Sequence, residues 1–127
     1  MNLENNASSK EFLILTKYKD FMNILDKIIE NIPKKDYIYK NKLKELSIEL
    51  LYFINKTNNE DNYKLISAYK VEINSLINTI DYIIERLFIK GYIAETSLKK
   101  VSYKLSEINR MSNKWLDNKI DYDSKNK

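Results

Sequence analysis

The chain has one glycine, Gly91, and one proline, Pro33, among its 127 residues. A β-sheet fold needs many tight turns, and those turns depend on glycine, proline and a few other residue types. A helical fold needs far fewer, because each long helix requires only a start and a stop signal. The sequence therefore predicts an all-α protein, and its length is that of a single domain.

Apolar residues recur at alternating steps of three and four along four segments, which is the pattern of helices that bury one face. Ser112 is the one polar residue on these heptad tracks. The tracks are Ile14, Tyr18, Phe21, Leu25, Ile28 and Ile32; Tyr39, Leu43, Leu46, Leu50 and Phe53; Ile66, Tyr69, Ile73, Leu76, Ile80, Ile83 and Leu87; and Leu98, Val101, Leu105, Ile108, Ser112 and Trp115.

Local signals place the ends of the first two helices. Ser8 and Glu11 have the spacing of a capping box, which predicts the start of the first helix. Pro33 interrupts that helix, because proline cannot continue it without the loss of a hydrogen bond. The second helix is expected over residues 36–55, and the polar residues 56–61 separate it from the third.

The third helix is expected over residues 61–89, with Gly91 as a left-handed C-cap. Thr96 is the expected N-cap of a fourth helix that ends near Asp117. Short connections make successive helices antiparallel neighbours. We therefore predict an up-down-up-down antiparallel four-helix bundle over residues 8–118, with residues 1–7 and 119–127 disordered.

Two helices carry more apolar residues than one buried stripe needs. The excess allows two interpretations. One is a wide stripe that faces the core of the same chain, and the other is a second apolar seam that contacts a partner or another subunit. The residues of this candidate interface are Leu15, Met22 and Ile29 in the first helix, and Ile77, Ile84 and Phe88 in the third.

The sequence lacks the residues of most catalytic sites. It has no histidine and no cysteine, which excludes Ser-His-Asp and Cys-His arrangements. One glycine cannot form a glycine-rich phosphate loop. We predict a protein that is not an enzyme and has no cofactor and no bound metal. The absence of a long apolar run and of a signal peptide predicts a cytoplasmic protein without membrane contact.

Positive charge is concentrated at one end of the predicted bundle. The net charge is +4. Antiparallel order brings residues 27–47 and 85–104 together, and these hold eleven basic and five acidic residues, a balance of +6, against −2 for the remainder. Such a surface attracts polyanions, and the release of their condensed counterions favours binding. The alternative is that these lysines only solvate the helix ends.

We predict that this end binds nucleic acid through charge and shape. Specific base readout is not expected, because the chain has only two arginines. Tyr37, Tyr39, Tyr92 and Tyr103 lie in the same segments and can stack on unpaired bases where they are exposed. The predicted nucleic-acid-binding residues are Lys34, Lys35, Lys40, Lys42, Lys44, Lys90, Lys99, Lys100 and Lys104.

Three motifs carry a family resemblance. They are IPKKDYIYKNKL at residues 32–43, LFIKGYI at 87–93 and INRMSNKWL at 108–116. The last has the form Ile-x-Arg-Met-x-x-x-Trp-Leu and is the most specific. On these motifs the chain resembles the Avd family, the accessory variability proteins of diversity-generating retroelements, over roughly residues 12–117.

The resemblance implies a four-helix bundle that assembles as a homopentameric barrel with a basic surface. It also implies a non-enzymatic protein that binds the retroelement's reverse transcriptase and its template RNA or cDNA, and that supports mutagenic reverse transcription. The chain departs from the family in having lysine where arginine is usual, and lysine lacks the bidentate fork for phosphate. The alternatives are an rRNA intervening-sequence-type four-helix protein and a purely structural adaptor that binds protein alone.

INRMSNKWL also holds two rare residues, Arg110 and Trp115. Trp115 falls on the fourth apolar track, so we expect it to fill the core at the end away from the lysines. Arg110 lies off the track and is expected to be a salt-bridge or interface residue.

Overall fold

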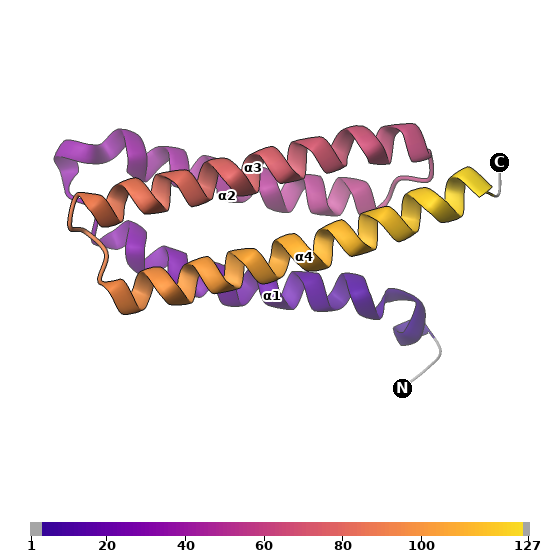
Figure 1. The fold of residues 1–127 in the computed structure, drawn as a ribbon, viewed down its shortest axis with the longest axis horizontal. Helices are drawn as coiled ribbons and strands as arrows, with labels where there is room; N and C mark the ends of the chain where they lie inside the picture. Colours follow the sequence, from indigo (N-terminus) through magenta and orange to yellow (C-terminus); the bar gives the residue numbers. More distant parts are fainter. Residues whose placement is uncertain (1–3, 126–127) are drawn as a thin grey trace.

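The computed structural model describes residues 4–125, and within that range the side chains of residues 13–122 and 125. Four long helices lie side by side and alternate in direction (Figure 1). This confirms the predicted all-α four-helix bundle. None of the helices in the described range is long and apolar enough to cross a membrane. The elements are α1 (Glu4–Glu30), the 3₁₀ turn η1 (Lys34–Asp36), α2 (Tyr37–Asn58), α3 (Tyr63–Ile89) and α4 (Glu95–Lys125).

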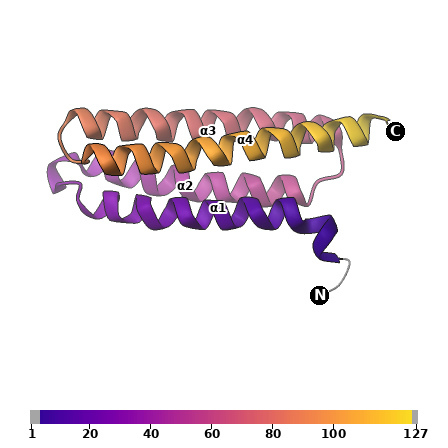
Figure 2. The same ribbon diagram turned by 60° about the horizontal axis from the view of Figure 1, so that its bottom comes forward.

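Each helix packs against two others, in the cyclic order α1, α4, α3, α2 (Figure 2). The α1–α2 pair is the loosest of the four. The end of α1, η1, the start of α2, the end of α3 and the start of α4 meet at one end of the bundle. We call this end, formed by residues 27–47 and 85–104, the basic end.

The predicted apolar tracks form the core. Every residue of the first track is buried, and the tracks of α2 and α3 are buried except for Tyr39, Phe53 and Tyr69, which are partly exposed. Tyr18 reaches across the loose α1–α2 pair, where its hydroxyl donates a 2.5 Å hydrogen bond to the carbonyl oxygen of Ser47. A hydrogen bond thus links the two helices that are in the loosest contact.

The fourth track differs from the prediction beyond Ile108. Leu116 is fully buried, whereas Trp115 is only partly buried, so the expectation that Trp115 fills the core was wrong. The buried face continues by steps of four, from Ile108 to Ser112 to Leu116. A strict seven-residue repeat drifts by about 20° per heptad around a straight helix, so an added step of four keeps the face turned inward.

The extra apolar residues lie mainly in the core of the chain itself. Ile29, Ile77 and Ile84 are each 4% exposed or less. They are therefore not available to a partner, and for them the structure supports the wide core-facing stripe. Leu15, Met22 and Phe88 are partly buried against the same core.

The α3–α4 connection confirms the predicted glycine C-cap. Gly91 has φ +86°, a left-handed conformation that glycine adopts without a steric penalty. The amide of Tyr92 donates to the carbonyl of Leu87 at 3.0 Å, and the amide of Gly91 donates to that of Phe88 at 2.9 Å. These two bonds form a Schellman motif, which satisfies carbonyls that the helix end leaves free.

Other helix ends differ from the expected positions. Helix α4 begins at Glu95 and the amide of Leu98 donates to the carbonyl of Ala94 at 2.9 Å, so Thr96 lies inside the first turn and is not the N-cap. Asn62 caps α3 through its side-chain oxygen. Helix α4 continues to Lys125, through most of the segment expected to be disordered.

The first helix begins at Glu4, before the predicted capping box. Residues 4–7, which we expected to be disordered, are therefore helical, and residues 1–3 lie outside the described part. The side chains of Ser8 and Glu11 also lie outside it.

Candidate nucleic-acid interface

A cluster of side chains joins the two connections at the basic end. The Asp36 carboxylate accepts a 2.5 Å hydrogen bond from the Tyr92 hydroxyl, and its other oxygen lies 3.5 Å from the Lys90 ammonium nitrogen. The Lys90 nitrogen also lies 5.7 Å from the centre of the Tyr39 ring. The Tyr92 hydrogen bond, followed by the Lys90 charge, holds the pKa of Asp36 below its usual value. The cluster fixes the spacing of the two connections.

One of the predicted binding residues, Lys90, belongs to this cluster. The Lys90 ammonium group already contacts the Asp36 carboxylate and the Tyr39 ring. The side chains of Lys90 and Asp36 are 33% and 16% exposed, so this pair is less accessible to a ligand than the other lysine–carboxylate pairs at this end. We therefore assign Lys90 a structural role at the basic end.

Two further predicted lysines have neighbouring carboxylates. The ammonium nitrogen of Lys42 lies 3.6 Å from Glu45, and that of Lys99 lies 3.6 Å from Glu95. All four side chains are more than half exposed. Exposed pairs of this kind contribute only about 0.3–0.5 kcal/mol. A phosphate can therefore compete for these two lysines.

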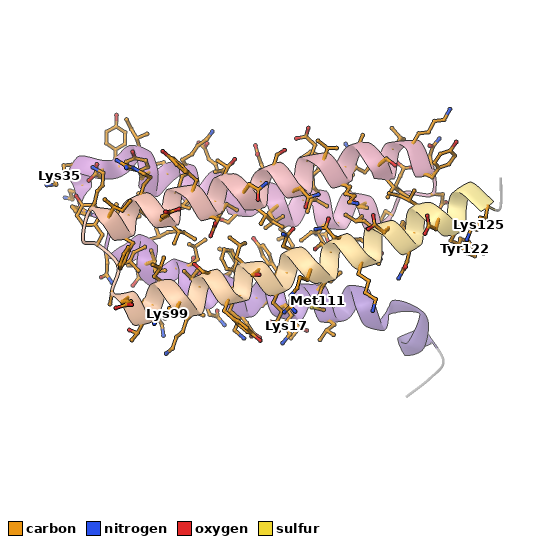
Figure 3. All side chains as sticks on the ribbon, in the orientation of Figure 1. Lys17, Lys35, Lys99, Met111, Tyr122 and Lys125 are labelled. Atoms are coloured by element: carbon orange, nitrogen blue, oxygen red, sulfur yellow. The ribbon has the colours of Figure 1, made fainter. Side chains whose placement is uncertain are left out.

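The other six predicted lysines have no ion-pair partner within 4.0 Å among the residues that the structure describes. They come from three elements that meet at the basic end. Figure 3 labels one of them, Lys35, and also the paired Lys99 at this end. These residues are Lys34 and Lys35 in η1, Lys40 and Lys44 in α2, and Lys100 and Lys104 in α4. We call these six residues the unpaired lysines.

The unpaired lysines flank α1 on two sides. The Ser47 hydroxyl donates to the Lys44 carbonyl one turn earlier, and the Ser47 carbonyl accepts from Tyr18 of α1, which places Lys44 on the α1 side of α2. Lys104 borders a hollow with Ile24 of α1, which places it on the α1 side of α4. Residues four apart lie one above the other on a helix, so Lys40 and Lys100 extend these two sides.

Two of the four tyrosines at this end are free to meet a ligand. Tyr37 is 59% exposed and Tyr103 is 61% exposed. Tyr39 lies under Lys90, and Tyr92 donates to Asp36. Only Tyr37 and Tyr103 therefore retain the exposed ring that base stacking requires.

Three lysines outside the basic end contact side chains of other helices. Lys17 of α1 pairs with Glu107 of α4 at 3.3 Å, and Lys70 of α3 pairs with Asp117 of α4. The ammonium nitrogen of Lys56 sits among three rings, 5.0 to 6.0 Å from their centres. Those rings belong to Tyr52, Phe53 and Tyr69.

The side chain of Arg110 is exposed on α4, with no carboxylate within 4.0 Å in the described part of the chain. The predicted salt bridge of Arg110 is thus not formed with any side chain that the structure describes, and its predicted interface role stays a prediction.

A second hollow, of about 290 Å³, lies between α3 and α4 and has a polar lining. Its one carboxylate is Asp81, whose pKa is raised by burial and then by the charge of Glu85. Among the side chains that the structure describes, no three His, Cys, Asp or Glu residues gather closely enough to hold a metal ion. The remaining lining residues are Ile77, Asn78, Ser102, Leu105, Ser106 and Asn109.

No protein-family model matches this sequence, and no curated protein matches it either. The likeness to Avd proteins therefore rests on the three sequence motifs alone. The geometry of the basic end stands independently of that likeness.

Proposed function

We propose that the protein is a non-enzymatic accessory protein that binds RNA or cDNA through the basic end. One observation carries the proposal: six lysines from three elements gather at this end, and none of them has a carboxylate partner within 4.0 Å in the described part of the chain. An unpaired lysine displaces a condensed counterion when it meets a phosphate, and this release drives non-specific binding.

The proposed binding follows charge and shape and not base sequence. Lysine is a compact point charge without the fork that recognises a guanine edge or a phosphate in two contacts. If all six unpaired lysines contact single-stranded phosphates, the logarithm of the binding constant falls with the logarithm of salt concentration with a slope of about −4. A shallower slope means that fewer lysines take part.

The wider role that we propose is that of an Avd-like protein of a diversity-generating retroelement. In that role the chain binds the element's reverse transcriptase and its template RNA or cDNA in the cytoplasm, acts as a homopentamer and supports mutagenic reverse transcription. This part of the proposal is supported by the motifs at residues 32–43, 87–93 and 108–116.

A protein-binding surface is favoured by a separate observation. Eight of the eleven exposed large apolar side chains in the described part of the chain lie on α2 and α3. Exposed apolar side chains that lie next to one another are typical of a protein contact, so contiguity of these residues supports a subunit or polymerase contact and also the alternative of a structural adaptor. The eight residues are Tyr37, Ile38, Ile48, Tyr52, Leu65, Val71, Tyr82 and Ile89.

The test is a matched pair of charge-reversal variants. The test variant carries Lys100→Glu and Lys104→Glu at the basic end. The control carries Lys64→Glu and Lys114→Glu, which change the same number of exposed or partly exposed lysines outside that end. Binding to a fluorescein-labelled RNA is measured by anisotropy over a range of salt concentrations, and circular dichroism checks that both variants are folded.

The proposal predicts that the test variant binds much more weakly and that its salt slope is shallower by about 1.4–1.8, because two phosphate contacts are lost. The control keeps the slope of the unaltered protein. Equal loss of binding in both variants shows that only net charge matters and contradicts a site at the basic end. Tight binding by the test variant contradicts it as well.

A further inference from the structure

A hollow of about 410 Å³ lies between α1 and α4 at the edge of the basic end. Ile24 of α1 and the ring of Tyr103 of α4 supply its apolar lining, and three lysines border it. Ile24 is partly buried against the core, so it forms a recessed surface. Tyr103 is 61% exposed. The bordering lysines are Lys99, Lys100 and Lys104.

The lining combines a flat apolar surface with a cationic border. On the α4 surface, Lys100 lies one turn before Tyr103, and Lys104 directly follows it. A ligand that suits both parts has a flat apolar body with negative groups beside it. A nucleotide within a strand has this chemistry, because the base has an apolar face and the phosphates flank it.

We propose that this hollow holds one unpaired base of a single-stranded nucleic acid, stacked on the Tyr103 ring, with the adjacent phosphates bound by Lys100 and Lys104. The inference rests on the proposed function and narrows it to single strands. In a duplex both faces of each base are covered by neighbouring bases, so only an unstacked base can offer a face to the Tyr103 ring.

The α1 side of the hollow gives the bound strand a direction. Asp20 lies one turn before Ile24, and Lys27 lies one turn after it on the same helix. A phosphate is repelled by Asp20 and attracted by Lys27. The strand therefore leaves the hollow towards the tip of the basic end, where Lys34 and Lys35 continue the positive surface.

An anionic membrane is the main competing ligand for a surface with both lysines and apolar groups. Proteins that bind membranes insert apolar side chains that project from the surface. Ile24 is recessed and partly buried, and Tyr103 is the one exposed large apolar side chain among the residues that line the hollow, so a bilayer gains little apolar contact there. The observations therefore favour a nucleic acid.

The test compares Tyr103→Ala, Tyr103→Phe and the control Tyr82→Ala. Tyr82 is 62% exposed on α3, outside the hollow, so the control removes an equally exposed ring. The probes are labelled single-stranded oligouridine, single-stranded oligothymidine, the duplex of oligouridine with oligoadenosine, and phosphatidylserine vesicles. Binding is measured with the full chain at one salt concentration.

Tyr103→Ala is expected to bind both single strands about 5- to 150-fold more weakly, the loss typical of one stacked base. Its binding to the duplex is unchanged. Tyr103→Phe keeps the ring and binds like the unaltered protein, as does Tyr82→Ala. The two single strands respond equally, because stacking makes no use of the 2′-hydroxyl.

Three results overturn the inference. If Tyr103→Ala binds single strands as well as the unaltered protein while reversal of Lys100 and Lys104 abolishes binding, stacking fails and the proposed function stands. Vesicle binding that depends on Tyr103, without oligonucleotide binding, assigns the hollow to a membrane. If the unaltered protein binds none of the nucleic acids, the proposed function fails together with the inference.

Discussion

Replacement of Ser112 by alanine is expected to stabilise the protein, although most substitutions of buried residues destabilise. Ser112 is 1% exposed and lies on the buried face of α4 between Ile108 and Leu116. Among the residues that the structure describes, its hydroxyl oxygen has no hydrogen-bond partner. A polar group in that position loses its bonds to water on folding and receives nothing in return.

Three contributions set the expected change in the free energy of unfolding. Relief of an unsatisfied buried hydroxyl is worth about 1–3 kcal/mol. Alanine adds about 0.5 kcal/mol of helix propensity. The small void left by the oxygen subtracts at most about 1 kcal/mol. The Ser112→Ala variant is therefore expected to gain about 0.5–3.5 kcal/mol in free energy of unfolding.

The assay is urea denaturation followed by circular dichroism at the helical band, with a thermal melt beside it. For a domain of this size each kcal/mol raises Tm by about 3–6 °C. Ser106→Ala is the matched control, because Ser106 is exposed on the same helix and gains only the propensity contribution. If Ser112→Ala gains no more than Ser106→Ala, or destabilises, the hydroxyl is bonded in solution, for example to the carbonyl four residues earlier.

Three further predictions test the fold. Gly91→Ala is expected to lower the free energy of unfolding by about 1–2 kcal/mol, because φ is +86° there, and a urea titration that shows no loss contradicts the left-handed cap. Leu116→Ala is expected to cost about 2–5 kcal/mol and more than Trp115→Ala, and the reverse order restores the heptad interpretation. Burial and the charge of Asp26 raise the pKa of Tyr18 to about 12, so the neutral phenol stabilises the fold below pH 10 and that stability is lost as pH rises towards 12. An absorbance titration detects the tyrosine that ionises at this raised pKa, and that ionisation is absent from the Tyr18→Phe variant.

The sequence predicted the parts of the fold that depend on local pattern. The first and third tracks, the break at Pro33 and the cap at Gly91 need only spacing and backbone preference. Trp115 was misplaced because the heptad was extended through Ser112, a polar residue that gives no signal of the helix's rotation. Whether Trp115 or Leu116 faces the core depends on how far the apolar face has rotated along the helix, and a short sequence motif does not reveal that rotation.

The basic end was predictable as a region but not in its detail. Antiparallel order alone brings its segments together. The role of Lys90 depends on Asp36, which lies in another connection, and no spacing rule relates them. The pair of Lys99 with Glu95 was open to prediction from its four-residue spacing. Ile24 lies off the predicted track, so nothing in the pattern indicated the hollow that it forms with α4.

The central claim is that the unpaired lysines form one nucleic-acid-binding surface, and lysine acetylation footprinting tests it most directly. The protein is acetylated briefly with and without single-stranded RNA, and the modification of each lysine is quantified by mass spectrometry. We expect RNA to protect Lys34, Lys35, Lys40, Lys44, Lys100 and Lys104, while exposed Lys64 and Lys114 react equally in both samples. Protection that is uniform over all lysines, or that falls on Lys64 and Lys114, contradicts a binding surface at the basic end.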